Sequence, residues 1–203
     1  MSSATRIIET TVQGEVFTHR VLWSTCQRQL AVARAETRGS WYFHLTAMMM
    51  GFMTFESYIN FLGTKLAPEL WANERSHFRS GQYAGTAGKL LKLCELHGVA
   101  FPDKGSRPYQ SLTKLKALRD FVAHGKPDEF EMTVSHPEGT NPALIKYTLD
   151  DYVSEQQAEE TIADVRAQIE ALHAAFGAKV GYDIILTNAL DGTLAMSSGS
   201  MSV

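Results

Sequence analysis

Three residues near the middle of the chain have side chains that can bind phosphate and move protons. Arg119, Asp120 and His124 lie in the segment LTKLKALRDFVAHG, residues 112–125. A guanidinium matches the oxygens of a phosphate, and histidine is the side chain that exchanges a proton most readily near neutral pH. Asp120 and His124 are four residues apart, so on a helix the carboxylate can hydrogen-bond one ring nitrogen of the histidine. The segment therefore brings together a permanent positive charge and a side chain that can exchange protons near neutral pH.

A helix must position these side chains. Leu112, Leu115 and Val122 recur on one side of an ideal helix, and Arg119 shares that side. A guanidinium on an apolar face stays charged, so it must be paired or kept in contact with water. The glycine that follows His124 predicts the end of the helix.

A second helix is predicted for residues 41–66, and it is apolar nearly all round. We expect it at the centre of the fold or at a subunit contact, since four methionines in residues 48–53 suit an adaptable packed surface. Glu56 and Asn60 are four residues apart and share one face of this helix. A buried carboxylate needs a partner, and Arg119 is the partner that we expect for Glu56.

The Arg119 segment resembles the HEPN superfamily. The sequence LRDFVAHG, residues 118–125, is similar to the Arg-polar-spacer-His signature of that family, in which Asn, His or Asp follows the arginine. Glu56 lies on the preceding long helix, where such domains often keep a buried acidic residue. The likeness covers residues 17–177. The same arginine-to-histidine spacing occurs elsewhere in the chain, without the apolar helix before it and the glycine after it.

This resemblance implies an all-helical, ribonuclease-like domain that acts as a homodimer without metal. It implies that Arg119 holds the scissile phosphate of RNA, that His124 is the acid or base, and that Asp120 orients His124. The RNA 2′-hydroxyl would be the nucleophile, with Glu56 and Asn60 in supporting positions. The resemblance leaves open a toxin or defence role, with an inhibitory protein as a further partner. No cofactor and no metal are expected.

Basic side chains gather around the predicted site. Residues 104–126 contain six lysines and arginines and one aspartate, in a chain whose net charge is −3. A basic window in an acidic chain can receive a polyanion. We therefore expect Lys114, Lys116 and Lys126 to bind RNA phosphates. A solvated charged face is the alternative explanation of the same run.

A non-catalytic interpretation starts from the same residues. If Arg119 pairs with Glu56 in the core while His124 stands alone in solvent, a helical dimer for protein interaction or nucleotide binding becomes the better description. A nucleoside triphosphatase is excluded. The segment GTAGKLL, residues 85–91, has the wrong glycine spacing for a phosphate loop, and leucine stands where serine or threonine is required. A serine hydrolase is disfavoured because no GxSxG sequence occurs.

Composition sets the scale of the fold. A chain of 203 residues with 44% hydrophobic and 20% charged residues is long enough for one well-buried core and short for two domains. The longest nearly apolar run, residues 45–55, is far below the roughly 20 residues of a membrane-spanning helix, so we expect a cytoplasmic protein without membrane contact. Cys26 and Cys94 lie apart without a CxxC pattern, which predicts reduced, buried thiols.

The predicted fold is mainly α, a HEPN-like helical bundle. Residues 1–16 form an N-terminal arm, residues 17–177 the helical domain, and residues 178–203 a flexible C-terminal tail. A β-hairpin is predicted as an insertion at about 128–149, between the Arg119 helix and the last long helix. A short strand pair is expected around Asp191-Gly192.

Further helices are predicted at residues 18–36 and 84–97 and from Ser154 onward, where Ser154 and Gln157 have the spacing of a capping box. In the first of these helices, aliphatic residues are expected to face inward and arginines outward. The inward set is Val21, Leu22, Leu30 and Ala33, and the outward set is Arg20, Arg28 and Arg34.

Overall fold

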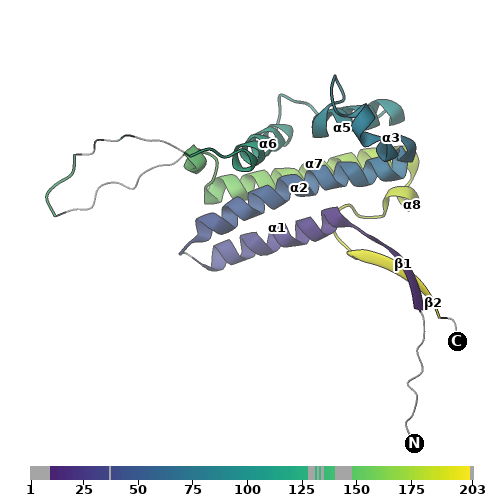
Figure 1. The fold of residues 1–203 in the computed structure, drawn as a ribbon, viewed down its shortest axis with the longest axis horizontal. Helices are drawn as coiled ribbons and strands as arrows, with labels where there is room; N and C mark the ends of the chain where they lie inside the picture. Colours follow the sequence, from purple (N-terminus) through teal and green to yellow (C-terminus); the bar gives the residue numbers. More distant parts are fainter. Residues whose placement is uncertain are drawn as a thin grey trace, which may run out of the picture.

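The computed structural model describes residues 10–36, 38–127, 131, 133, 135–139 and 148–201. These residues form eight α-helices, one short 3-10 helix and two strands (Figure 1). The elements follow the chain as β1 Thr10–Val16, α1 Thr18–Ala35, α2 Ser40–Leu66, α3 Pro68–Ala72, α4 Glu74–His77, α5 Gly85–His97, α6 Tyr109–Ala123, η1 Thr148–Asp151, α7 Glu155–Val180, α8 Tyr182–Ile185 and β2 Ala195–Met201. The mainly helical fold predicted from the sequence is confirmed, and its HEPN likeness stays a prediction.

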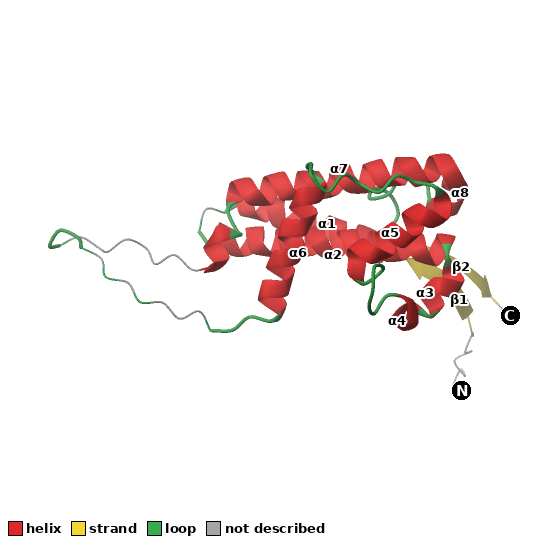
Figure 2. Cartoon of the chain, turned by 90° about the horizontal axis from the view of Figure 1, so that it is seen from above, coloured by secondary structure: helices red, strands yellow, loops and turns green. Residues whose placement is uncertain are grey.

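The long helix α2 is the centre of the bundle. It contacts α1, α3, α5, α6, α7 and α8. In Figure 1 α1 lies below α2, and α5 and α6 lie above the layer that α2 forms with α7. Figure 2 shows from above how α6 crosses this layer. These neighbours cover most sides of α2, which accounts for its apolar character, while Tyr42 and Met53 stay exposed. No helix among the described residues is long and apolar enough to cross a membrane.

Two glycines of α2 allow its neighbours to come close. A Cβ atom on Gly51 would lie 2.3 Å from Cδ1 of Ile162 on α7. A Cβ atom on Gly63 would lie 1.9 Å from the indole of Trp71, which α3 folds back onto α2. Both distances are shorter than van der Waals contact, so a larger residue at either position would push the neighbouring element away.

Most predicted helix boundaries agree with the structure within one or two residues. The helices predicted at 18–36, 41–66 and 84–97 are α1, α2 and α5. The backbone N–H of Gln157 donates to Oγ of Ser154 at 3.1 Å, so Ser154 is the N-cap of α7 as predicted. The short helices α3 and α4 were not predicted. Both cysteines are buried and unpaired, and burial raises the pKa of Cys26 to about 12 and that of Cys94 to about 11.

The predicted faces of α1 are partly wrong. Leu30 and Ala33 are buried, and Arg28 is exposed, as expected. Val21, expected inward, is 38% exposed. Arg20, expected outward, is 4% exposed and lies in the core. Arg20 is buried because a segment of the chain that is distant in sequence covers the first turn of α1.

That segment runs through residues 186–194 and supplies backbone carbonyls to Arg20. Nε of Arg20 donates to the carbonyl oxygen of Ala189 at 3.2 Å, Nη1 to that of Thr193 at 2.8 Å, and Nη2 to that of Asn188. His19 Nε2 also lies 3.1 Å from the Ala189 oxygen. The guanidinium of Arg20 is thereby held by carbonyl dipoles, to which the charge of Asp191 adds. This part of the predicted C-terminal tail helps to build the core.

The two strands form a ribbon that leaves one end of the bundle (Figure 1). They pair antiparallel, with Thr10 opposite Met201 and Val16 opposite Ala195. The strand pair expected around Asp191-Gly192 is therefore wrong, because β2 pairs with the N-terminal arm. The β-hairpin predicted at 128–149 falls mostly outside the described residues, although its last two positions belong to the 3-10 helix η1.

Candidate functional site

Helix α6 carries the predicted site at its C-terminal end. Leu112, Leu115 and Leu118 are buried and anchor the helix on the bundle. Val122, which was predicted to share the inward face, is 39% exposed. Arg119 lies at the border between the buried and the exposed side, and its side chain is 31% exposed.

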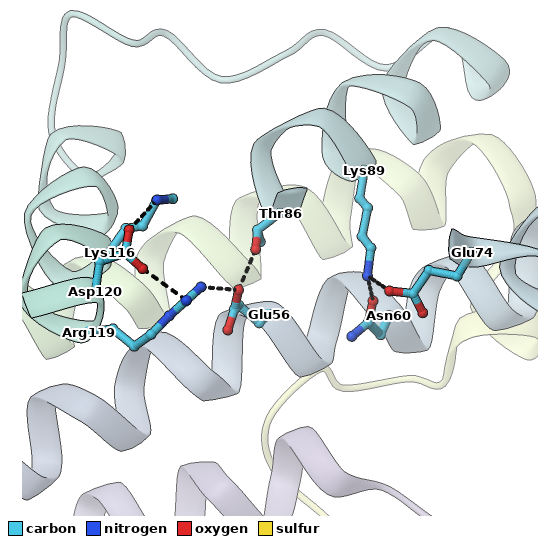
Figure 3. A network of polar contacts seen from close by, with 8 residues as sticks. All are labelled: Glu56, Asn60, Glu74, Thr86, Lys89, Lys116, Arg119 and Asp120. Carbon is cyan, nitrogen blue, oxygen red and sulfur yellow. Dashed lines mark hydrogen bonds and ion pairs between the residues drawn. The ribbon is translucent and has the colours of Figure 1, made fainter. Parts of the chain in front are cut away.

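Each of the two Nη atoms of Arg119 forms an ion pair with a carboxylate. Nη2 lies 3.0 Å from Oε1 of Glu56 on α2, and Nη1 lies 2.9 Å from Oδ1 of Asp120. The guanidinium carbon lies 5.3 Å from the centre of the Phe52 ring, within the range of a cation–π contact. The Nε–H is buried, and no described residue accepts a hydrogen bond from it. Arg119 is therefore held at its tip by two opposite charges (Figure 3). The Phe52 ring contacts its flat side.

Glu56 joins three helices. Its Oε1 accepts hydrogen bonds from Arg119 on α6 and, at 2.5 Å, from Oγ1 of Thr86 on α5. The pairing of Arg119 with Glu56 is the one expected from the sequence. The carboxylate is 29% exposed, however, whereas a buried one was predicted. We call Glu56, Thr86, Lys116, Arg119 and Asp120 the Arg119 cluster; its two cations and two anions balance.

Asp120 does not orient His124 in the way predicted. Its carboxylate holds Lys116 and Arg119, and no described residue hydrogen-bonds the exposed His124 ring. The link between the two residues is the backbone, where the N–H of His124 donates to the carbonyl of Asp120 at 3.1 Å. The Lys116 hydrogen bond is the main cause that lowers the pKa of Asp120, and the nearby charges of Arg119 and His124 add to it. Two cations on the same helix turn therefore compete with the histidine for this carboxylate.

Asn60 belongs to a separate group one helix turn further along α2. Its Oδ1 accepts from Nζ of Lys89 at 2.8 Å and from Nε1 of Trp71 at 3.3 Å. Lys89 also pairs with Glu74 of α4. Figure 3 shows the two groups side by side along α2. Asn60 is thus not brought to Arg119, and it tethers α3 and α5 to α2.

Only one of the three lysines predicted to bind phosphate reaches the Arg119 cluster. Lys116 does so through Asp120. Lys114 is two residues earlier, about 200° around the helix, and lines a different cavity with Arg107 and Tyr152 between α6 and α7. Lys126 is exposed beyond the end of α6.

Sequence reasoning missed Thr86 and Lys89. Both lie on α5, three residues apart and hence on one side of that helix, within the segment GTAGKLL. Their spacing was a usable signal for a polar helix face. The residues that they meet, Glu56 and Asn60, follow only from the way α5 packs on α2.

Nothing in the described part of the chain gathers three or more metal-ligating His, Cys, Asp or Glu side chains. Comparison with models of known protein families finds no match to this chain. Comparisons with curated proteins and with solved structures find none either. The fold and the site alone therefore describe the protein: it is a helical bundle with a partly exposed arginine, paired with two carboxylates, five residues before an exposed histidine.

Proposed function

We propose that the protein is a metal-independent endoribonuclease of HEPN type that acts as a homodimer. The observation that carries the proposal is the position of two side chains at the end of α6. The side chain of Arg119 is 31% exposed, so its pair with Glu56 does not lie in the core, where the non-catalytic interpretation places it, and His124 is exposed at the C-cap of the same helix. A fixed guanidinium suits a phosphate, and a histidine in contact with solvent is free to exchange protons.

In the proposed reaction the 2′-hydroxyl oxygen attacks the neighbouring phosphorus, and the bond from phosphorus to the 5′-oxygen breaks. One proton leaves the 2′-hydroxyl and one is added to the 5′-oxygen, so two proton carriers are needed. His124 of each protomer of the dimer supplies one of them. Arg119 binds the non-bridging oxygens and stabilises the charge that grows on them. The phosphate displaces Asp120 from Nη1, and Lys116 keeps the released carboxylate in place.

An apolar stripe on α2 supports the dimer. Tyr42 and Met53 are 69% and 40% exposed, and Met49 between them is partly buried. Their spacing of seven and four residues places them on one side of the helix, and Glu56 continues that side. A second copy that covers this stripe would bring its own Arg119 cluster close to the first. Symmetric pairing is the commonest way for a protein to cover such a surface.

The test of this proposal is the cleavage of an RNA and of a DNA with the same sequence, at neutral pH, in low salt and in EDTA. The RNA should be cut and leave a 2′,3′-cyclic phosphate, while the DNA, which has no 2′-hydroxyl, should remain intact. Loss of RNA cleavage in EDTA and its return with magnesium would overturn the proposed chemistry.

A second candidate is a non-catalytic helical dimer for protein interaction or nucleotide binding. It is favoured by the charge balance of the Arg119 cluster and by the lack of a described hydrogen-bond partner for the His124 ring. This candidate predicts a dimer at micromolar concentration that cuts no RNA. Sedimentation equilibrium tests the dimer, which both candidates require. A monomer at micromolar concentration would count against both.

A further inference from the structure

A small apolar cavity opens beside the Arg119 cluster, between α5 and α6. Its volume is about 220 Å3. The floor consists of buried side chains from three helices: Phe52, Phe55, Leu90 and Leu112. A polar rim surrounds this floor. Such a site, apolar inside with a few polar groups at its edge, is typical of small-molecule pockets.

The cavity and the Arg119 cluster share residues. Thr86, which donates to Glu56, and Lys116, which pairs with Asp120, both line the rim. Phe52 belongs to the floor, and its ring also lies under the guanidinium of Arg119 at 5.3 Å. A ligand in the cavity would therefore have the two cations of the cluster at one side of it.

We propose that this cavity binds the base of a nucleotide whose phosphate lies at Arg119 and Lys116. The inference deepens the proposed function, on which it rests for the identity of the polymer. The cavity is smaller than the roughly 300 to 1,000 Å3 of drug-sized sites, so it holds one ring system and leaves ribose and phosphate outside. Bases bind by stacking on aromatic side chains without sequence preference, and Phe52 and Phe55 supply such rings.

The cations beside the cavity favour a nucleotide over an apolar side chain of a protein partner as its ligand. A leucine or phenylalanine would fill the floor, but it would leave the rim cations paired as they are. A nucleotide satisfies both parts at once, because its ring enters the apolar floor while its phosphate exchanges with Asp120 on Arg119. The cavity would thus hold the base of the nucleotide whose phosphate is presented to the proposed cleavage site.

The test uses mononucleotides, which the protein cannot cleave, and the wild-type chain. Calorimetry with adenosine 5′-monophosphate and with ribose 5-phosphate separates the base from the phosphate. The nucleotide should bind about tenfold more tightly than the sugar phosphate, because stacking is absent from the latter. Equal affinity would reduce the site to a phosphate site and overturn the inference.

Two variants locate the binding. Ala87→Met from α5 and Thr113→Met from α6 place a side chain into the cavity from opposite walls, and both positions are exposed, so folding should be preserved. Each should remove the tenfold preference. Ala167→Met, at an exposed position of α7, is the matched control and should retain it. A preference that survives both cavity variants would contradict the inference.

These measurements distinguish this inference from the proposed function. If RNA is not cleaved but the nucleotide preference exists and both methionine variants abolish it, the base site stands and the ribonuclease proposal fails. If RNA is cleaved and the preference is absent, the ribonuclease proposal stands and the base site fails.

Discussion

Two arginines of this protein are held in opposite ways. Arg20 is 4% exposed, and three backbone carbonyls accept its hydrogen bonds. Arg119 is 31% exposed, and two carboxylates hold it. Carbonyls that belong to the folded chain cannot leave, whereas a carboxylate on a side chain can rotate away and give its place to another anion. The comparison indicates that Arg20 stabilises the fold and that Arg119 is available for binding.

The largest effect on stability is expected at Arg20. Arg20→Ala would leave three carbonyls without their donor in a covered position, at a cost of at least about 3 kcal/mol in the free energy of unfolding. For a chain of this length that lowers Tm by roughly 6 to 12 °C. Arg28→Ala, an exposed arginine of the same helix, is the control and should melt within about 2 °C of wild type. Equal Tm values for the two variants would refute the structural role of Arg20.

The two regions should also respond to acid in different pH ranges. Burial, with the nearby charge of Arg20, lowers the pKa of His19 beside Arg20 from 6.5 to about 4. Between pH 6.5 and 4 the unfolded chain binds a proton at His19 and the folded chain does not. The free energy of unfolding therefore falls as the pH falls through this range. The loss amounts to about 3 kcal/mol. Asp120 of the Arg119 cluster has a lowered pKa, so its contribution is lost only as the pH falls below about 4.

Urea unfolding at pH 7, 5.5 and 4.5 measures this difference. The free energy of unfolding should fall across the series, and His19→Gln should make this fall smaller because glutamine does not titrate. Part of the fall should remain, since burial also lowers the pKa of His173. Asp120→Asn should leave the slope above pH 4.5 unchanged. A slope that His19→Gln does not alter would show that other groups cause it.

A smaller loss is expected for Arg119→Ala. A fully buried ion pair that loses one partner costs about 3 to 5 kcal/mol, but this pair is about one-third exposed, so we expect about 1 to 2 kcal/mol. Adding Glu56→Gln should restore most of the loss, because the amide no longer needs a cation. The double variant should remain unable to cut RNA. Thermal melting and an RNA cleavage assay of both variants check this, and a double variant that cuts RNA would contradict the role of Arg119.

The local part of the fold could be predicted from the sequence. Apolar residues at helical spacing gave α1, α2 and α5 with boundaries correct to one or two residues, and Ser154 marked the start of α7. Such patterns depend on residues within a few turns of each other. The pairing of Arg119 with Glu56 could also be predicted, since each is a charged residue on an apolar helix face.

The remaining contacts are set by the tertiary arrangement. Arg20 is buried because residues 188–193 return to the first turn of α1, and β1 pairs with a strand at the far end of the chain. The sequence around either partner contains no pattern that predicts these contacts. The expected Asp120–His124 hydrogen bond failed for a different reason. Helical spacing allows the contact, but Lys116 and Arg119 of the same helix also reach this carboxylate and form ion pairs with it.

The smallest effect on folding, and the most direct test of the proposed site, is expected at His124. Its ring is exposed, so His124→Ala should melt within about 1 °C of wild type. Cleavage of a structured RNA in EDTA at neutral pH should nevertheless fall by roughly 10²- to 10⁴-fold, as expected for the loss of a proton carrier. The exposed His77 of α4 provides the control, and His77→Ala should cut RNA at the wild-type rate. If His124→Ala cuts RNA as fast as wild type, the proposed site has no proton carrier and the account is wrong.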